Sequence, residues 1–138
     1  NRNCLYAIDD CFFRFWFRFI YKYLHLVEQR QMIQLQKIIV RDFDVFAGRA
    51  LERYFKTKFL EEGRYTRIGA WWDRKGANEI DLVCENEFEG VLDFYEVKLS
   101  SERYDEQRLR EKTIAFFKKH PDKTSMKIKL VGLSVEDM

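Results

Sequence analysis

The sequence predicts an α/β fold in which a helix, three strands, a second helix and a last strand build one mixed four-stranded sheet. Apolar residues recur at helical spacing from residue 42 to residue 62. Two later apolar runs, residues 80–84 and 91–99, flank a polar break that suits a hairpin. An aromatic-rich helical segment is expected to precede this fold.

The helical segment is apolar from residue 5 to residue 27, with a basic residue every four positions at Arg14, Arg18 and Lys22. Asp9 or Asp10 can cap its start. Its many aromatic positions predict a helix that buries most of its circumference, with the basic stripe in solvent rather than on phosphates. The charges that interrupt the run argue against a membrane span.

Composition and charge restrict the class of protein without selecting a partner. The chain has 138 residues, 46% of them hydrophobic and 17% aromatic, which is typical of a globular domain. Its 25 basic and 23 acidic residues leave a net charge of +2, which neither requires nor excludes nucleic acid. Three cysteines without a CxxC pair favour a reducing, cytoplasmic setting over a disulfide framework.

We expect a helical linker or docking segment over residues 1–40 and the α/β domain over 41–138. The domain's first helix should start at Asp42 or Asp44, and its first strand should cover residues 65–72. After the third strand, Ser100 or Ser101 should cap a helix that Pro121 ends. Residues 126–133 then form a strand parallel to the third strand, because a helical crossover joins the two.

Three charged residues interrupt the paired apolar runs. Asp81 lies in the first run, and Glu96 and Lys98 lie in the second at alternate positions, so that both point to one side of the strand. If Asp81 pairs opposite Glu96, the three groups converge. Lys112, on the helix that follows, could face the same place.

Carboxylates in apolar strands cost desolvation energy, and a divalent cation would compensate them. Mg²⁺ or Mn²⁺ held by Asp81 and Glu96 could polarise a phosphodiester, with Lys98 beside the attacking water. The alternative is a structural cluster in which Lys98 neutralises the two acids. The motif alone does not separate the two interpretations.

Glu52 is a further candidate, at the edge of the buried face of the first helix. It lies one turn beyond Gly48, where the missing side chain would let another backbone approach closely. An acid there could reach Asp81 and Glu96. Considered alone, Glu52 is better explained as an exposed helical glutamate paired with neighbouring basic residues.

Four stretches carry a resemblance to a known family: YAIDDCFFRFWFRFI near the start, GRALE at 48–52, IGAWWDRKGANEIDLV at 68–83 and EVK at 96–98. The chain resembles the C-terminal domain of archaeal and bacterial AAA+ type ATPases, a nuclease-like domain of the PD-(D/E)XK superfamily. The resemblance implies a restriction-endonuclease-like core. It implies metal binding by Asp81 and Glu96, water or transition-state contact by Lys98, and a supporting role for Glu52. The sequence departs from the superfamily pattern at Ile80, which replaces proline.

The function expected from this resemblance is that of a DNA-acting, Mg²⁺- or Mn²⁺-dependent endonuclease module. ATP would bind only to an ATPase domain upstream in the same polypeptide, because this chain has no P-loop pattern and begins at Asn1. The alternative is a catalytically silent domain that binds DNA or another protein and regulates the attached ATPase. In that case the aromatic first helix is the docking surface, and self-association through it is plausible.

Overall fold

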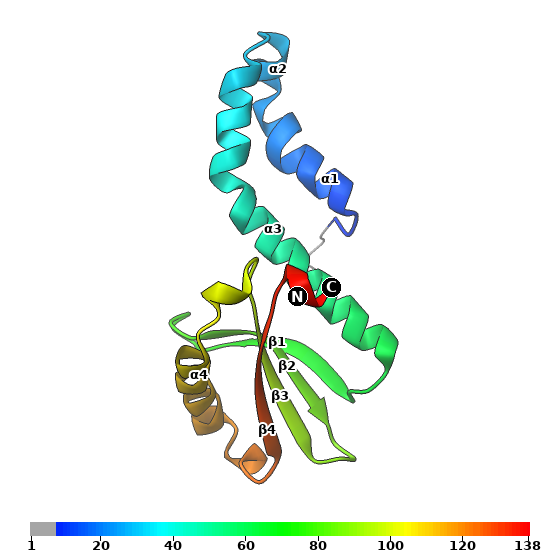
Figure 1. Cartoon of the computed structure of the whole chain (residues 1–138), viewed down its shortest axis with the longest axis vertical. Helices are drawn as coiled ribbons and strands as arrows, with labels where there is room; N and C mark the ends of the chain where they lie inside the picture. Colours follow the sequence, from blue (N-terminus) through cyan, green and yellow to red (C-terminus); the bar gives the residue numbers. More distant parts are fainter. Residues whose placement is uncertain (1–7) are drawn as a thin grey trace, which may run out of the picture. The chain divides into compact units, whose positions relative to one another are not determined.

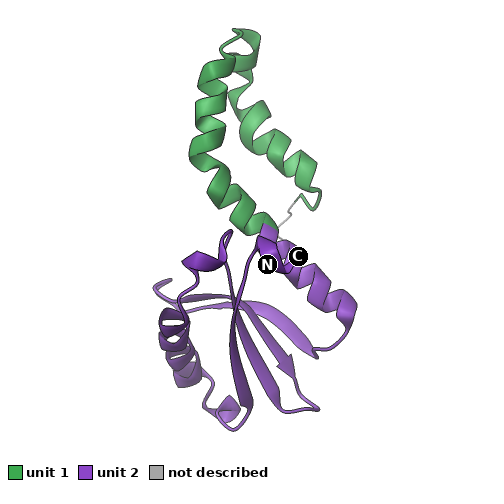
Figure 2. Cartoon of the chain, in the orientation of Figure 1, with its two compact units in different colours: residues 1–50 green, residues 51–138 purple. Residues whose placement is uncertain are grey.

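The computed structural model describes residues 8–138. The chain forms two compact units, residues 1–50 and 51–138, shown in separate colours in Figure 2. The long helix α3 (Met32–Glu62) contributes residues to both units. The boundary expected after residue 40 remains a prediction.

The first unit contains a short helical series followed by the start of α3. The series runs through α1 (Cys11–Phe15), a π-helical turn η1 (Trp16–Ile20), a 3₁₀ turn η2 (Tyr21–Tyr23) and α2 (Leu24–Glu28). Asp10 caps α1 as expected, because its Oδ1 accepts a hydrogen bond from the Phe13 amide at 3.0 Å. The expected helix start at Asp42 or Asp44 is wrong. The helix begins at Met32, since neither glycine nor proline interrupts the residues before Asp42.

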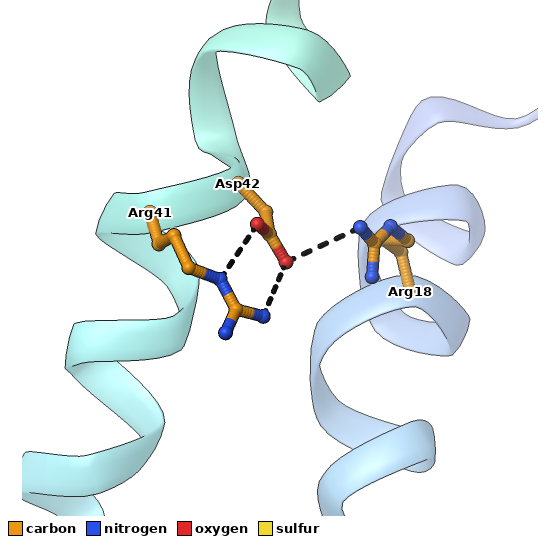
Figure 3. A network of polar contacts seen from close by, with 3 residues as sticks. All are labelled: Arg18, Arg41 and Asp42. Carbon is orange, nitrogen blue, oxygen red and sulfur yellow. Dashed lines mark hydrogen bonds and ion pairs between the residues drawn. The ribbon is translucent and has the colours of Figure 1, made fainter.

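An ion-pair network joins the helical series to α3 within the first unit (Figure 3). Each carboxylate oxygen of Asp42 accepts a hydrogen bond of 2.9 Å from Arg41. Oδ2 of Asp42 also accepts a hydrogen bond of 3.3 Å from Arg18. The hydrogen bond from Arg41 lowers the pKa of Asp42. Arg18 of the basic stripe is therefore engaged with a carboxylate rather than only with solvent.

The aromatic residues of the first unit are divided between a small core and the surface. Phe19 is fully buried, and its ring meets that of Phe46 at 5.5 Å. Phe12 and Tyr21, in contrast, are 68% and 60% exposed. The expectation that this helix buries most of its circumference is wrong, because the part of α3 in this unit covers only one side of it.

The second unit confirms the predicted α/β fold, with one sheet in the order β1-β2-β3-β4 (Figure 1). Strands β1 (Arg67–Trp72), β2 (Glu79–Asn86) and β3 (Val91–Val97) are antiparallel neighbours, and β4 (Lys127–Leu133) is parallel to β3. Helix α4 (Glu106–Lys119) is the crossover, and Pro121 follows its end. Asp105 caps α4, rather than Ser100 or Ser101, because a 3₁₀ turn and an extended residue, Tyr104, intervene.

Each face of the sheet has its own apolar cluster. On one side, which we call the α3 face, Leu51, Phe55 and Phe59 of α3 pack with buried side chains of β2 and β3. On the other side, the α4 face, Leu109 and Phe116 of α4 pack with the strands. The strand residues of the α4 face include Ile80, Leu92 and Phe94.

A β-bulge in β2 changes which side chains reach the α4 face. Gly69 of β1 pairs with Val83, but Trp71 pairs with Ile80, so β2 has one residue more than β1 in this interval. Asp81 lies within that interval. A bulge redirects side chains locally, which allows Ile80 and Val83 to contact one cluster although they are three residues apart.

A glycine in β4 lets the ring of Tyr104 lie directly on the sheet. Gly132 pairs with Glu96 of β3, and a Cβ atom at Gly132 would collide with Cγ of Tyr104. We therefore expect Gly132→Ala to lower the free energy of unfolding by about 2 kcal/mol, the usual cost of overpacking. Urea unfolding measures this difference.

Gly69→Ala is the matched control, because Gly69 is also a strand glycine but has nothing within 4 Å of its Cβ position. Its free energy of unfolding should change by less than about 0.5 kcal/mol. Equal stability of the two variants would show that the Tyr104 ring does not need the space at Gly132.

Candidate functional site

The strand register brings Asp81 and Glu96 to neighbouring positions. Leu82 pairs with Tyr95, and the same antiparallel register continued by one residue places Asp81 opposite Glu96. The Asp81 side chain reaches across the strands, since its Oδ2 accepts a hydrogen bond from the Val97 amide at 2.7 Å. The two carboxylates thus lie side by side on β2 and β3.

Glu96 is the most buried member of this acid–lysine cluster, by which we mean Asp81, Glu96, Lys98 and Lys112. It is 3% exposed. Its Oε1 lies 2.9 Å from Nζ of Lys112 and 3.3 Å from Nζ of Lys98. Lys112 comes from α4, so the cluster lies on the α4 face, and Lys98 points to the same side as Glu96, as expected.

The second oxygen of Glu96 is left without a partner. Oε2 is buried and has no hydrogen-bond partner among the described residues. A buried acceptor without a partner costs free energy, and more so when the group carries charge. A cation or a donor from a ligand would remove that cost.

Burial also acts on Asp81. It raises the pKa of this carboxyl above its ordinary value, while the Val97 amide and the charge of Lys98 act in the opposite direction. The ionised form of Asp81 is thus disfavoured by its surroundings. Additional positive charge next to Asp81 would stabilise the ionised form.

The residues fit a hard divalent cation in number and type, although the formal charges already balance. Two carboxylates face two lysines, so the cluster is neutral without a metal. No group of three or more histidine, cysteine, aspartate or glutamate residues suited to a metal occurs within residues 8–138. Mg²⁺ is commonly held by only one or two carboxylates together with water and substrate phosphates, and Asp81 with Glu96 can supply those carboxylates.

Glu52 is half-buried on α3, beside Leu51, which packs on the α3 face. Lys112, which contacts Glu96, comes from α4 on the opposite side of the sheet from α3. Glu52 therefore lies on a helix that covers the other face of the sheet from the acid–lysine cluster. Its supporting role remains a prediction. The reason given for it is wrong in one respect, because a Cβ at Gly48 would have open space rather than a closely packed backbone.

Tyr104 is a neighbour of the cluster that the sequence did not indicate. Its ring lies on Gly132, the residue paired with Glu96, and its hydroxyl is buried without a hydrogen-bond partner in the described part of the chain. Burial raises the pKa of Tyr104, and the charge of Glu96 adds to the effect. The only signal in the sequence was a glycine in the last strand.

A second buried acid, Asp93, belongs to a different cluster. Its Oδ2 accepts a hydrogen bond from the Tyr65 hydroxyl at 2.5 Å, and that hydroxyl also meets the hydroxyl of Tyr95 at 2.6 Å. Asp93 pairs with Cys84, whose pKa is raised to about 12 by burial. These residues lie on the α3 face, away from Glu96.

Comparison with known proteins places the chain in a family. The sequence profile of DUF234, described as archaeal and bacterial proteins of unknown function, matches residues 16–112, more than half of the chain. The chain belongs to the DUF234 family. The matched segment contains all four residues of the acid–lysine cluster.

A relative in the archaeon Methanocaldococcus jannaschii, the uncharacterized protein MJECL04, is 30% identical over 100 residues. The alignment covers 67% of this DUF234 member but only 22% of the relative, so the chain spans less than a quarter of the relative's length. Within residues 8–138, no helix has the length and apolar character needed to cross a membrane.

The raised pKa of Asp81 predicts a pH-dependent effect of Asp81→Asn. Because the folded protein holds this proton more tightly than the unfolded chain, the Asp81 charge lowers stability as pH rises through the ordinary aspartate pKa and up to the raised one. Asp81→Asn keeps an acceptor for Val97 and removes the charge. It should be more stable than the wild type at neutral pH, with the gain vanishing at low pH, as measured by urea unfolding across pH.

Asp73→Asn is the control, because its effect on stability at neutral pH should be opposite to that of Asp81→Asn. The side chain of Asn78 and backbone amides of the β1–β2 turn lower the pKa of Asp73. Its stabilising effect is present above the ordinary pKa and is lost as pH falls through the lowered one, so this variant should be less stable than the wild type at neutral pH. A stability loss for Asp81→Asn at neutral pH would contradict the assignment.

The two lysines around Glu96 should contribute unequally. The Lys112 side chain is 15% exposed and that of Lys98 is 35% exposed. Lys112→Met leaves a buried carboxylate with one partner and should cost about 3 kcal/mol, whereas Lys98→Met should cost at most about 1 kcal/mol. Adding Glu96→Gln to Lys112→Met should recover part of this loss of unfolding free energy. A loss in the double variant equal to the sum of the two single-variant losses would exclude a direct coupling.

Proposed function

We propose that residues 51–138 form a PD-(D/E)XK-like module that cleaves DNA with the help of a divalent metal ion. The observation that supports this most directly is the pair of carboxylates on adjacent strands, Asp81 and the buried Glu96, where one oxygen of Glu96 has no hydrogen-bond partner among residues 8–138. An oxygen of Asp93 on the α3 face is also without a partner in that range, so it is the second carboxylate and the two lysines that distinguish the acid–lysine cluster.

Each residue of the acid–lysine cluster has a distinct part in this proposal. Asp81 and Glu96 would hold Mg²⁺ or Mn²⁺, which supplies Lewis-acid activation of the scissile phosphate and of a water molecule. The Val97 amide fixes one oxygen of Asp81 and orients the carboxylate. Lys98, the more exposed of the two lysines, is placed to orient the attacking water and to offset negative charge that develops on the phosphate.

Lys112 acts through Glu96 rather than on the substrate. Its ammonium group is largely buried and lies closer to Oε1 of Glu96 than that of Lys98. An ion pair at this distance keeps the carboxylate oriented. Lys112 is thus a positioning residue that keeps Glu96 able to bind a cation.

The resemblance to AAA+ type ATPases supports a position for this module at the C-terminal end of a larger ATP-dependent protein. The length of the relative from Methanocaldococcus jannaschii agrees with such an arrangement, because the chain spans only 22% of it. ATP would then bind to the upstream domain of the same polypeptide. The module would act on DNA in the cytoplasm.

The second candidate function is a catalytically silent domain that binds DNA or a protein and regulates the attached ATPase. The exposed aromatic residues of the first unit favour it, since Phe12, Phe13 and Tyr21 are each more than half exposed. Under this proposal, changing Trp16 to serine impairs function, and removing the charges of Asp81, Glu96 and Lys98 does not.

Plasmid nicking in the presence of Mn²⁺ tests the leading proposal. Wild-type protein should convert supercoiled to relaxed plasmid, and Lys98→Ala should lower the rate at least about a hundredfold, because an electrostatic contact made in the transition state is lost. Asp81→Asn should abolish both nicking and Mn²⁺ binding measured by calorimetry in the presence of DNA.

Lys129→Ala is the matched control for Lys98→Ala, because Lys129 is an exposed lysine on β4 of the same sheet. Its nicking rate should equal that of the wild type. If neither the wild type nor this control nicks DNA, and the Asp81/Glu96/Lys98 triple variant still binds it, the module is a silent DNA-binding domain.

A further inference from the structure

A small hollow lies on the α4 face, between β1 and the end of α4, and encloses about 170 Å³. Its floor includes Gly69 and Val83, which are paired across β1 and β2. Its walls include the aromatic rings of Trp71 and Phe116 and the imidazole of His120. The hollow is separate from the acid–lysine cluster but opens on the same face of the sheet.

The aromatic walls are held in place by one another. The imidazole of His120 stacks on the ring of Phe116 with centroids 4.3 Å apart, and Nδ1 of His120 lies 3.1 Å from the Phe116 carbonyl oxygen. Trp71 meets Phe116 edge to face at 5.5 Å. Rings that are already ordered lose little conformational freedom when a flat ligand stacks on them.

The floor of the hollow leaves room for such a ligand. Gly69 has no side chain, and a Cβ at this position would meet nothing within 4 Å. Glu85 and Lys123 form a half-buried ion pair of 2.7 Å at the side of the hollow. An ammonium group has three donors and a carboxylate has two acceptor oxygens, so each retains capacity beyond this one contact for the edge of a nucleobase.

A second, more open hollow shares Trp71 with the first in its lining. It adds Trp72, which is 66% exposed, together with Arg74 and Lys119. The two acids that line these hollows make contacts within the protein. Asp73 accepts hydrogen bonds from amides of its own turn, and Glu85 pairs with Lys123.

Arg67, Arg74 and Lys119 are thus left as exposed positive charges beside two tryptophans. Aromatic faces interleaved with basic side chains are the pattern that binds single-stranded nucleic acid, because the rings stack on bases and the charges contact phosphates. Duplex DNA, in contrast, presents its bases only by their edges in the grooves.

We infer that the hollow at Gly69, Trp71 and His120 binds an unpaired base of single-stranded DNA. This inference rests on the proposed nuclease function and specifies its substrate. Lys112 at the acid–lysine cluster and Lys119 at the second hollow are seven residues apart on α4, which corresponds to about 10 Å along the helix. A strand of a few nucleotides can bridge that distance, so the substrate is DNA with an unpaired stretch next to the scissile bond.

Fluorescence anisotropy of the full chain with labelled oligothymidylate of about twelve nucleotides, in EDTA, tests the inference. Oligothymidylate should bind at least about tenfold more tightly than an abasic strand of equal length and charge, because one stacked base contributes about 1–3 kcal/mol. Binding to oligouridylate and to a duplex of the same length is measured in parallel. The duplex should bind more weakly than the single strand.

Gly69→Val is the informative variant, since its side chain fills the hollow and valine suits a strand. It should lower the affinity for oligothymidylate about tenfold, to that of the abasic strand, with an unchanged thermal unfolding curve. Lys129→Ala, on the exposed surface of β4, should bind like the wild type. Equal binding of abasic and normal strands, or an unaffected Gly69→Val variant, would overturn the inference.

The binding measurement and the nicking assay fail independently. EDTA removes metal ions, so the binding measurement does not depend on cleavage. Base-dependent binding without any nicking activity would support the base-binding hollow and contradict the nuclease function. Nicking activity together with equal affinity for the normal and the abasic strand would support the nuclease function and contradict base binding in the hollow. Tighter binding of oligouridylate than of oligothymidylate would identify RNA as the ligand and overturn the assignment to DNA.

Discussion

The second unit depends on the burial of one carboxylate, that of Glu96. A carboxylate at 3% exposure needs compensation for its lost hydration, and at Glu96 two elements bring positive charge to it. Lys98 lies two residues after Glu96 in the chain, and Lys112 forms an ion pair between α4 and β3. The parallel neighbour β4 contributes Gly132 opposite Glu96, which makes room for Tyr104 to close one side. The crossover helix, the last strand and the candidate site are therefore arranged around the same residue.

Most of the fold could be predicted because its signals are local. Alternating and continuous apolar runs identified the strands, and the helical crossover required β4 to be parallel to β3. The errors have local causes as well. Neither glycine nor proline marks the break between α2 and α3 at residues 29–31, so the start of α3 could not be located from periodicity alone. Ser100 or Ser101 was expected to cap α4, but Asp105 does so, because the backbone at Tyr104 is extended and delays the start of the helix.

The candidate site was predictable only where it follows from strand geometry. Alternation placed Glu96 and Lys98 on one side, and a simple hairpin register placed Asp81 next to them. The bulge in β2, the stacking of His120 on Phe116 and the position of Tyr104 are tertiary features without a local pattern. The supporting role of Glu52 stays a prediction, because a position on a helix does not by itself fix which side chains the residue meets.

The neutrality of the acid–lysine cluster bears on how a metal ion would bind. Two lysines offset the two carboxylates, so a free divalent cation would meet a site of no net charge and would bind it weakly. A substrate phosphate adds negative charge and further oxygen ligands at the same place. Displacement of the exposed Lys98 from Glu96 toward that phosphate would free the carboxylate for the cation. Under the proposed function, metal and DNA would then bind together rather than in turn, and the reactive arrangement would form only when substrate is present.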